Sequence, residues 1–223
     1  MREARHFVPP DHHAITARMM EAEKAYRTAV AYVQAMLSEV VVVDHVDILQ
    51  ADKTGIPVHI PTPLRVSKFH DPSPGGAKEV FQFIPDYEWE AWYQSKSIKK
   101  SNAKMTEALT VYGAPTKIGV QTGYYTFGTL VHETFHYLSH VKFRMAVTPA
   151  QNEGFTELLA RVAMNDMRPR SDIRGHGDFN GDDLKGIKKC ADPEDREEMV
   201  RLVQAYILGD AVALRMITAF LKI

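Results

Sequence analysis

The segment VHETFHYLSH, residues 131–140, contains residue types that can bind and use a metal ion. It places His132 and His136 four positions apart, with Glu133 directly after the first histidine. On an α-helix, residues four apart lie on the same face, about 6 Å apart along the axis. Both imidazoles can therefore bind one ion, while Glu133 lies beside them and can reach a metal-bound water. The pattern predicts a Zn2+ site at which Glu133 acts as general base.

A catalytic zinc ion usually takes three protein ligands and leaves one position for water. The segment NEGFTE begins at Asn152, so Glu153 follows His136 by 17 positions. Over residues 126–165, the chain resembles the gluzincin, or thermolysin-like, branch of the zincin metallopeptidases. The resemblance implies that Glu153 is the third ligand and that Glu157 hydrogen-bonds the first histidine. Helical spacing agrees, because Glu153 and Glu157 are four apart and share a face.

Two departures from the family pattern and two alternatives remain at this point. Glu157 stands where the family more usually has Asp, and the gap before Glu153 is a few residues shorter than in thermolysin. Glu153 could instead be an acidic residue favoured by the helix dipole. His140 is a rival ligand, but three histidines in line on one helix give poor tetrahedral geometry. We therefore favour Glu153 as the ligand and interpret His140 as lining the cleft or supporting the site.

The elements that must position these residues follow from hydrophobic periodicity. A helix over 126–143 has an apolar face that can pack into the core and an opposite face, with the histidines, that lines a cleft. A second helix runs from Thr148 or Asn152 to Asn165. We expect the other elements to be a helix over 11–39 capped by Asp11, extended chain over 40–70, a strand over 79–84, partly helical chain over 86–112 with Trp89 and Trp92 packed inside, a strand over 116–125, a loop over 167–192, and closing helices over 193–222 that break near Gly209.

The resulting fold class is α+β, in one domain over residues 1–223. The sheet-bearing part covers about 1–125 and the helical part about 126–223. The family resemblance implies a zincin-like fold: a small, mostly antiparallel sheet with the active-site helix beneath it. It also implies an extended peptide or protein substrate bound along an edge strand, for which Ile56–Val66 and 117–125 are the candidates.

The predicted chemistry is hydrolysis of peptide bonds by a zinc-activated water. Glu133 accepts the proton of that water and passes it to the leaving amine. A further donor normally stabilises the oxyanion. His176 is the first choice, because its glycine-flanked loop follows the third-ligand helix; Arg174, Tyr124 and Tyr125 are the other candidates.

Composition limits the alternatives. The chain has 223 residues, 45% of them hydrophobic, and a net charge of -1, so nothing global indicates a nucleic-acid or membrane partner. No apolar run is long enough to span a membrane, and the N-terminus does not resemble a signal peptide. The localisation stays open, and the sequence could be one domain of a larger secreted or translocated protein.

The resemblance leaves other functions open. The same core could serve a toxin or effector that attacks another amide, such as a peptidoglycan cross-link. It could also be a non-catalytic zincin-like binding domain, although the intact Glu133 argues against this. The acidic segment Asp178–Asp183 resembles half of a calcium loop, but lacks its glycine and its final acid, so a plain acidic turn is favoured.

Overall fold

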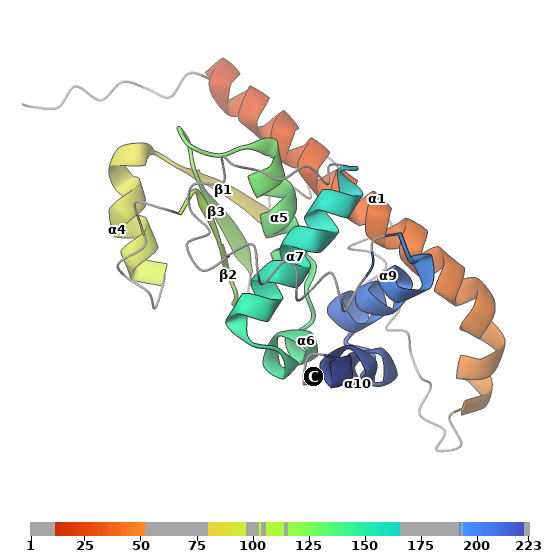
Figure 1. Cartoon of the computed structure of the whole chain (residues 1–223). Helices are drawn as coiled ribbons and strands as arrows, with labels where there is room; N and C mark the ends of the chain where they lie inside the picture. The colour runs from red at the N-terminus through yellow and green to blue at the C-terminus, as the bar shows by residue number, and fades with distance from the viewer. Residues whose placement is uncertain are drawn as a thin grey trace, which may run out of the picture.

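The computed structural model of the chain describes residues 12–51, 80–96, 103, 106–113, 116–165, 192 and 194–220. They form an α+β arrangement, which confirms the predicted fold class. Helix α4 (Asp86–Lys96) lies on one face of a small sheet, whereas α5 (Phe127–Leu138) and α1 (His12–Ala51) lie toward the other (Figure 1). Helix α5, which carries both candidate histidines, is therefore in the middle of the molecule.

The sheet is mixed and has three strands in the order β1-β3-β2. Strand β1 (Phe81–Ile84) is parallel to β3 (Lys117–Gln121), and β2 (Ala108–Val111) is antiparallel to β3. The expected antiparallel character thus holds for one of the two pairings. Strand β2 lies within the segment expected to be partly helical, and it was missed. Because β3 is central, 117–125 is not the edge that the sequence suggested; β2 is an edge among the described strands.

The two faces of the sheet have different partners. Side chains alternate along a strand, so Ile118 and Val120 of β3 point into the main core beneath α5. Gly119, between them, faces α4, where the Trp92 ring packs so closely that a Cβ on Gly119 would lie 1.9 Å from it. The β2–β3 register pairs Thr110 with Ile118, which turns the Thr110 side chain toward α5.

Helix α1 is longer than the sequence suggested. It continues from His12 to Ala51, so residues 40–51 are helical and not extended. The β-branched residues in this stretch disfavour a helix by only a few tenths of a kcal/mol each. Lengthening an existing helix needs no new nucleus, which outweighs that preference. The expected cap Asp11 and the candidate edge Ile56–Val66 lie outside the described residues.

The predicted helix over 126–143 is in fact two helices. Helix α5 ends at Leu138, Ser139 is its C-cap, and His140 is the N-cap of α6 (Val141–Ala146). The Ser139 hydroxyl donates to the His136 carbonyl, and His140 Nδ1 accepts from a backbone N–H of α6. These local bonds compete with the helical pattern and end α5 without a glycine.

The remaining helices agree with the sequence. Helix α7 (Pro149–Ala163) follows its N-cap Thr148. The closing part consists of α9 (Arg196–Val203), the π-helical turn η2 (Gln204–Leu208) and α10 (Ala211–Phe220). Gly209, at φ 63°, separates η2 from α10, as expected. The predicted loop over 167–192, with Arg174, His176 and the acidic segment, falls almost entirely outside the described residues.

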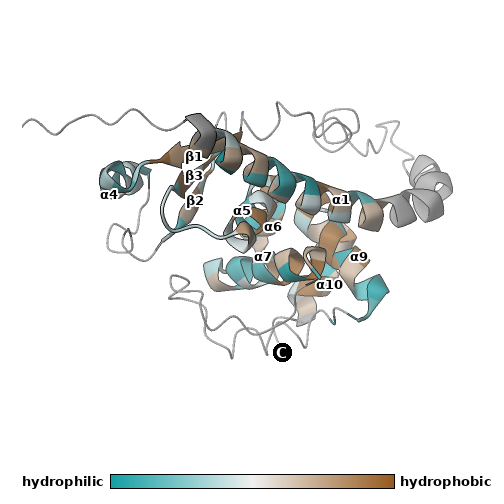
Figure 2. Ribbon diagram, turned by 90° about the horizontal axis from the view of Figure 1, so that it is seen from above, coloured by the Kyte–Doolittle hydropathy of each residue, from teal (hydrophilic) through white to brown (hydrophobic). Residues whose placement is uncertain are grey.

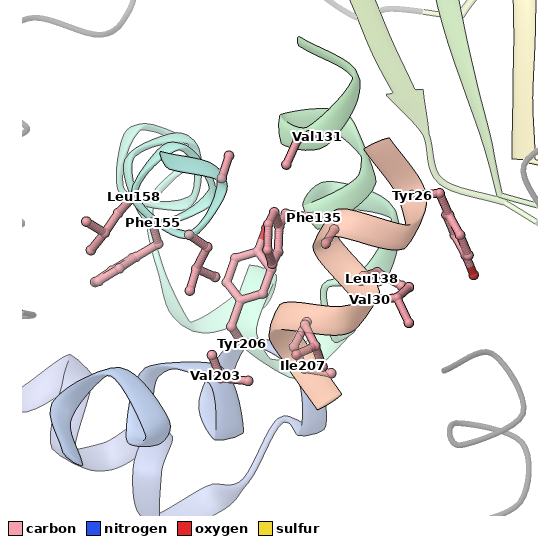
Figure 3. Packing of buried hydrophobic residues seen from close by; sticks show 14 of the residues in the cluster. Tyr26, Val30, Val131, Phe135, Leu138, Phe155, Leu158, Val203, Tyr206 and Ile207 are labelled. Carbon is pink, nitrogen blue, oxygen red and sulfur yellow. The ribbon is translucent and has the colours of Figure 1, made fainter. Parts of the chain in front are cut away.

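One hydrophobic core joins these helices. Phe135 of α5, Phe155 of α7 and Tyr206 of η2 are fully buried and lie close together (Figure 3). In the coloured part of α1, hydrophobic and hydrophilic residues alternate along the ribbon, as expected of a helix with one face on the core (Figure 2). No described helix alone is long and apolar enough to cross a membrane; the bent pair Arg196–Leu208 and Ala211–Ala219 reaches that length and composition only when its two parts are combined.

Candidate metal centre

The position of helix α5, and so of its histidines, is fixed by its N-cap and by the burial of both of its faces. Its first turn is fixed by Thr126, whose hydroxyl accepts the backbone N–H of Thr129. Its apolar face is buried in the core, as the sequence predicted. The opposite face, with His132 and His136, was expected to line a cleft. It is buried as well, because α7 packs against it.

Helix α7 supplies the acidic residues. A capping box between Thr148 and Gln151 fixes where the helix begins, and Pro149, in the first turn, favours the same start. Glu153 and Glu157 then lie on successive turns of the face that meets α5. Their placement follows from the starting point of the helix and from the four-residue spacing.

Three ligand atoms converge between α5 and α7. His132 Nε2 lies 3.1 Å from His136 Nε2 and 3.3 Å from Glu153 Oε2, and His136 Nε2 lies 3.0 Å from Glu153 Oε2. Ligand atoms around a tetrahedral zinc ion, at about 2.0–2.1 Å from it, are about 3.3–3.4 Å apart. The group is therefore close enough to hold one metal ion.

The donor set also favours a bound cation. His132 Nδ1 lies 2.9 Å from a Glu157 oxygen, and a carboxylate only accepts, so this nitrogen carries the proton. In the neutral ring, Nε2 then has only a lone pair. It faces a second imidazole nitrogen and the Glu153 carboxylate, which also only accepts. Lone pairs this close repel each other unless a metal ion or a proton lies among them.

The charges of the site act in the same direction. Burial lowers the pKa of His132, but hydrogen bonds with Glu153 and Glu157 outweigh it and raise the pKa to about 10. Burial raises the pKa of Glu157, yet His132 and Arg161 outweigh it and lower the pKa to about 2. Burial also raises the pKa of Glu153, and the histidines hold it well below its usual value. Two ionised carboxylates, of which Glu157 is also paired with Arg161, thus favour positive charge in this buried site.

Glu157 is held in turn by Arg161. The Arg161 side chain donates to Glu157 Oε1 at 2.6 Å, while Glu157 Oε2 faces His132. Both side chains of this ion pair are 8% exposed. A carboxylate that orients a metal-binding histidine is a common feature of zinc sites. The sequence predicted Glu157 in this position but not Arg161, although its spacing of four from Glu157 was visible.

Glu133 is near the ligands but is not one of the grouped ligand residues. Its Oε2 accepts a hydrogen bond of 2.6 Å from the hydroxyl of Thr110 on β2. The same hydroxyl is 3.1 Å from the Glu133 carbonyl oxygen. The edge strand therefore fixes the carboxylate, a contact that sequence reasoning missed together with β2 itself.

Solvent reaches the centre at Glu153, the most exposed of its three ligand residues. The His132 and His136 side chains are 3% and 6% exposed, whereas Glu153 is 38% exposed. Tyr112, just after β2, lies near His136: its hydroxyl is 3.4 Å from His136 Nδ1, and Arg144 stacks on its ring at 3.9 Å. Burial raises the pKa of the Tyr112 hydroxyl to about 12, so it stays protonated.

The other predicted residues lie elsewhere or outside the described chain. His140 caps α6 and its ring packs beside Gly209, so it does not join the ligand group. Tyr124 is 63% exposed, and the Tyr125 hydroxyl donates to Glu21 of α1. His176, the first choice for stabilising an oxyanion, is not among the described residues.

Comparisons with known proteins found no relative. No protein-family model, curated protein or solved structure matches this chain. Any functional assignment therefore rests on the geometry and chemistry of the centre.

Proposed function

We propose that the chain is a zinc-dependent metallopeptidase with Glu133 as its general base. The observation that carries this proposal is the convergence of His132, His136 and Glu153 beside a further buried acid outside the ligand group. Two imidazoles and one carboxylate are a known ligand set of catalytic zinc in metalloproteases. Histidine nitrogen and glutamate oxygen are both ordinary protein ligands of zinc.

The chain's own residues have separate tasks in the proposed reaction. When bound, zinc supplies a water acidified to a pKa near 7 and polarises the scissile carbonyl. Glu133 accepts the proton of the attacking water and then donates it to the leaving amine. Thr110 holds the Glu133 carboxylate in one position, so that little reorientation precedes the proton transfer.

Strand β2 offers a binding edge for the substrate. Among the described strands it pairs only with β3, so its other edge can pair with an extended peptide. Thr110 ties this strand to the metal-binding helix, which would bring a paired peptide beside Glu133. We therefore expect extended, unfolded protein segments to be the substrates.

The test uses the full chain loaded with zinc. Incubation with an unfolded protein, such as a reduced and alkylated one, should yield fragments that mass spectrometry can map. A chelator should stop their formation, and added zinc should restore it. Purified peptidoglycan serves as the alternative amide substrate. Cleavage of peptidoglycan alone would reject the peptidase proposal, and absence of cleavage in both would reject a hydrolase.

A further inference from the structure

His136 is held on its Nδ1 side by neutral groups, unlike His132, which faces a carboxylate. The hydroxyls of Tyr112 and Thr156 and the side-chain amide of Asn152 all lie 3.4 Å from His136 Nδ1. This distance is long for a hydrogen bond, so small movements decide which group holds the ring. The group that is itself fixed most firmly will orient His136 most strongly.

Thr156 is that group. It is fully buried, and its hydroxyl lies 2.7 Å from the Asn152 carbonyl oxygen and 2.5 Å from the Tyr206 hydroxyl. A threonine hydroxyl has one proton and two lone pairs. Its proton goes to the Asn152 carbonyl, which only accepts. Tyr206 must then donate to Thr156, which leaves a lone pair for a donor at His136 Nδ1.

This arrangement selects one tautomer of His136. With its proton on Nδ1, the ring presents the Nε2 lone pair to the other ligand atoms, as a metal ligand must. Asn152 presents its amide nitrogen to His136 Nδ1, while within the described part of the chain its buried Oδ1 has no hydrogen-bond partner, so it fits this tautomer only with the amide reversed. Rotating the amide by 180° exchanges its nitrogen and oxygen, and Oδ1 then accepts from the same Nδ1–H.

Tyr206 reaches this position from the closing helices. Its side chain projects from η2 into the space between α5 and α7 (Figure 3). Its ring packs on the Phe143 ring, with 4.7 Å between the ring centroids. Its backbone carbonyl accepts a hydrogen bond of 2.8 Å from the backbone N–H of His140. Burial raises the pKa of its phenol well above the usual value, so it remains a donor. Such π-helical turns occur frequently at functional sites.

We propose that Tyr206 is a positioning residue of the metal centre: by donating to Thr156, it fixes the tautomer and orientation of His136. The closing helices thereby contribute to metal binding without supplying a ligand. This inference rests on the proposed zinc site. It does not depend on which bond the loaded protein hydrolyses.

The test compares Tyr206→Phe with Tyr26→Phe in the full chain. Each substitution removes one hydroxyl from a buried tyrosine. Tyr26 lies on α1, and its side chain points away from Tyr206 (Figure 3). Thr156→Val removes the acceptor while keeping the shape, and it carries the test if Tyr206→Phe does not fold. Zinc affinity is measured by competition with a chromophoric chelator. The visible spectrum of the Co2+-loaded chain reports the ligand geometry.

We expect Tyr206→Phe and Thr156→Val each to weaken zinc binding roughly 10-fold, as loss of a group that orients a ligand usually does. Both should also alter the Co2+ spectrum, and the double variant should add little. Tyr26→Phe should keep the affinity and the spectrum. Wild-type zinc affinity in Tyr206→Phe, or an equal loss of affinity in Tyr26→Phe, would overturn this inference and leave the proposed zinc site standing. A wild-type chain that binds neither metal would overturn the zinc site itself.

Discussion

Replacing Glu133 by Gln separates catalysis from metal binding. The Thr110 hydroxyl donates to Glu133 Oε2, and a glutamine side chain at this position also has an oxygen that can accept this bond. Only the negative charge and the ability to take a proton are lost. Because Glu133 lies outside the ligand group, the variant should keep its zinc and its fold.

The substitution should change the cleavage rate much more than the free energy of unfolding. Losing a general base typically lowers the rate about 10²–10⁴-fold. This corresponds to about 2.7–5.4 kcal/mol of transition-state stabilisation, at 1.36 kcal/mol for each factor of ten. Weakening one charge-assisted hydrogen bond should change the free energy of unfolding by only about 1 kcal/mol. Metal content, thermal unfolding and peptide cleavage must be measured on the same preparation.

Two results would refute this reasoning in different ways. Undiminished cleavage by Glu133→Gln would show that Glu133 is not the base. Loss of zinc would show instead that Glu133 is a ligand and that the ligand assignment is wrong. The charge-preserving substitution Glu133→Asp provides a control, because it keeps a base but shortens its reach.

Three further substitutions test the surroundings of the site and the packing of α4 on the sheet. Thr110→Val should lower the cleavage rate about 10–100-fold at unchanged zinc content, because the general base loses its anchor; a wild-type rate would exclude that role. Glu157→Ala should weaken zinc binding about 10–100-fold in a competition titration, and unchanged affinity would mean that it does not orient the ligand. Gly119→Ala should lower the free energy of unfolding by about 1–3 kcal/mol, because the new Cβ would overlap the Trp92 ring. In a Trp92→Ala background, urea denaturation should show a smaller loss, and an equal loss would rule out this overlap as the cause.

The ligand residues could be predicted because their spacing is local. Two histidines four apart meet on one helical face wherever the helix forms. The start of α7 was predicted at Thr148 or Asn152, and the structure selects Thr148 as the N-cap, where Pro149 and Gln151 are also helix-start residues. Once both helices pack together, Glu153 and Glu157 face the histidines. Hydrophobic periodicity and the four-residue spacing therefore predicted the helices and the histidine pair, whereas the family resemblance was what pointed to Glu153 and Glu157.

The surrounding residues could not be predicted, because long-range contacts bring them to the site. Thr110 is 23 positions from Glu133, and Tyr206 is 50 positions from Thr156. Strand β2 has only four residues, too few for a clear alternating pattern. The end of α5 at Ser139 depends on hydroxyl and imidazole caps, which propensity alone does not reveal.

Zinc content is the measurement that tests the central claim most directly. After dialysis against metal-free buffer, the wild-type chain should retain about one zinc ion, as a site with three protein ligands does. His132→Ala, His136→Ala and Glu153→Ala should each lose most of it. His140→Ala, which removes a neighbouring imidazole that caps α6, should retain it. A wild-type chain without zinc would contradict the account, as would zinc lost from His140→Ala but kept by Glu153→Ala.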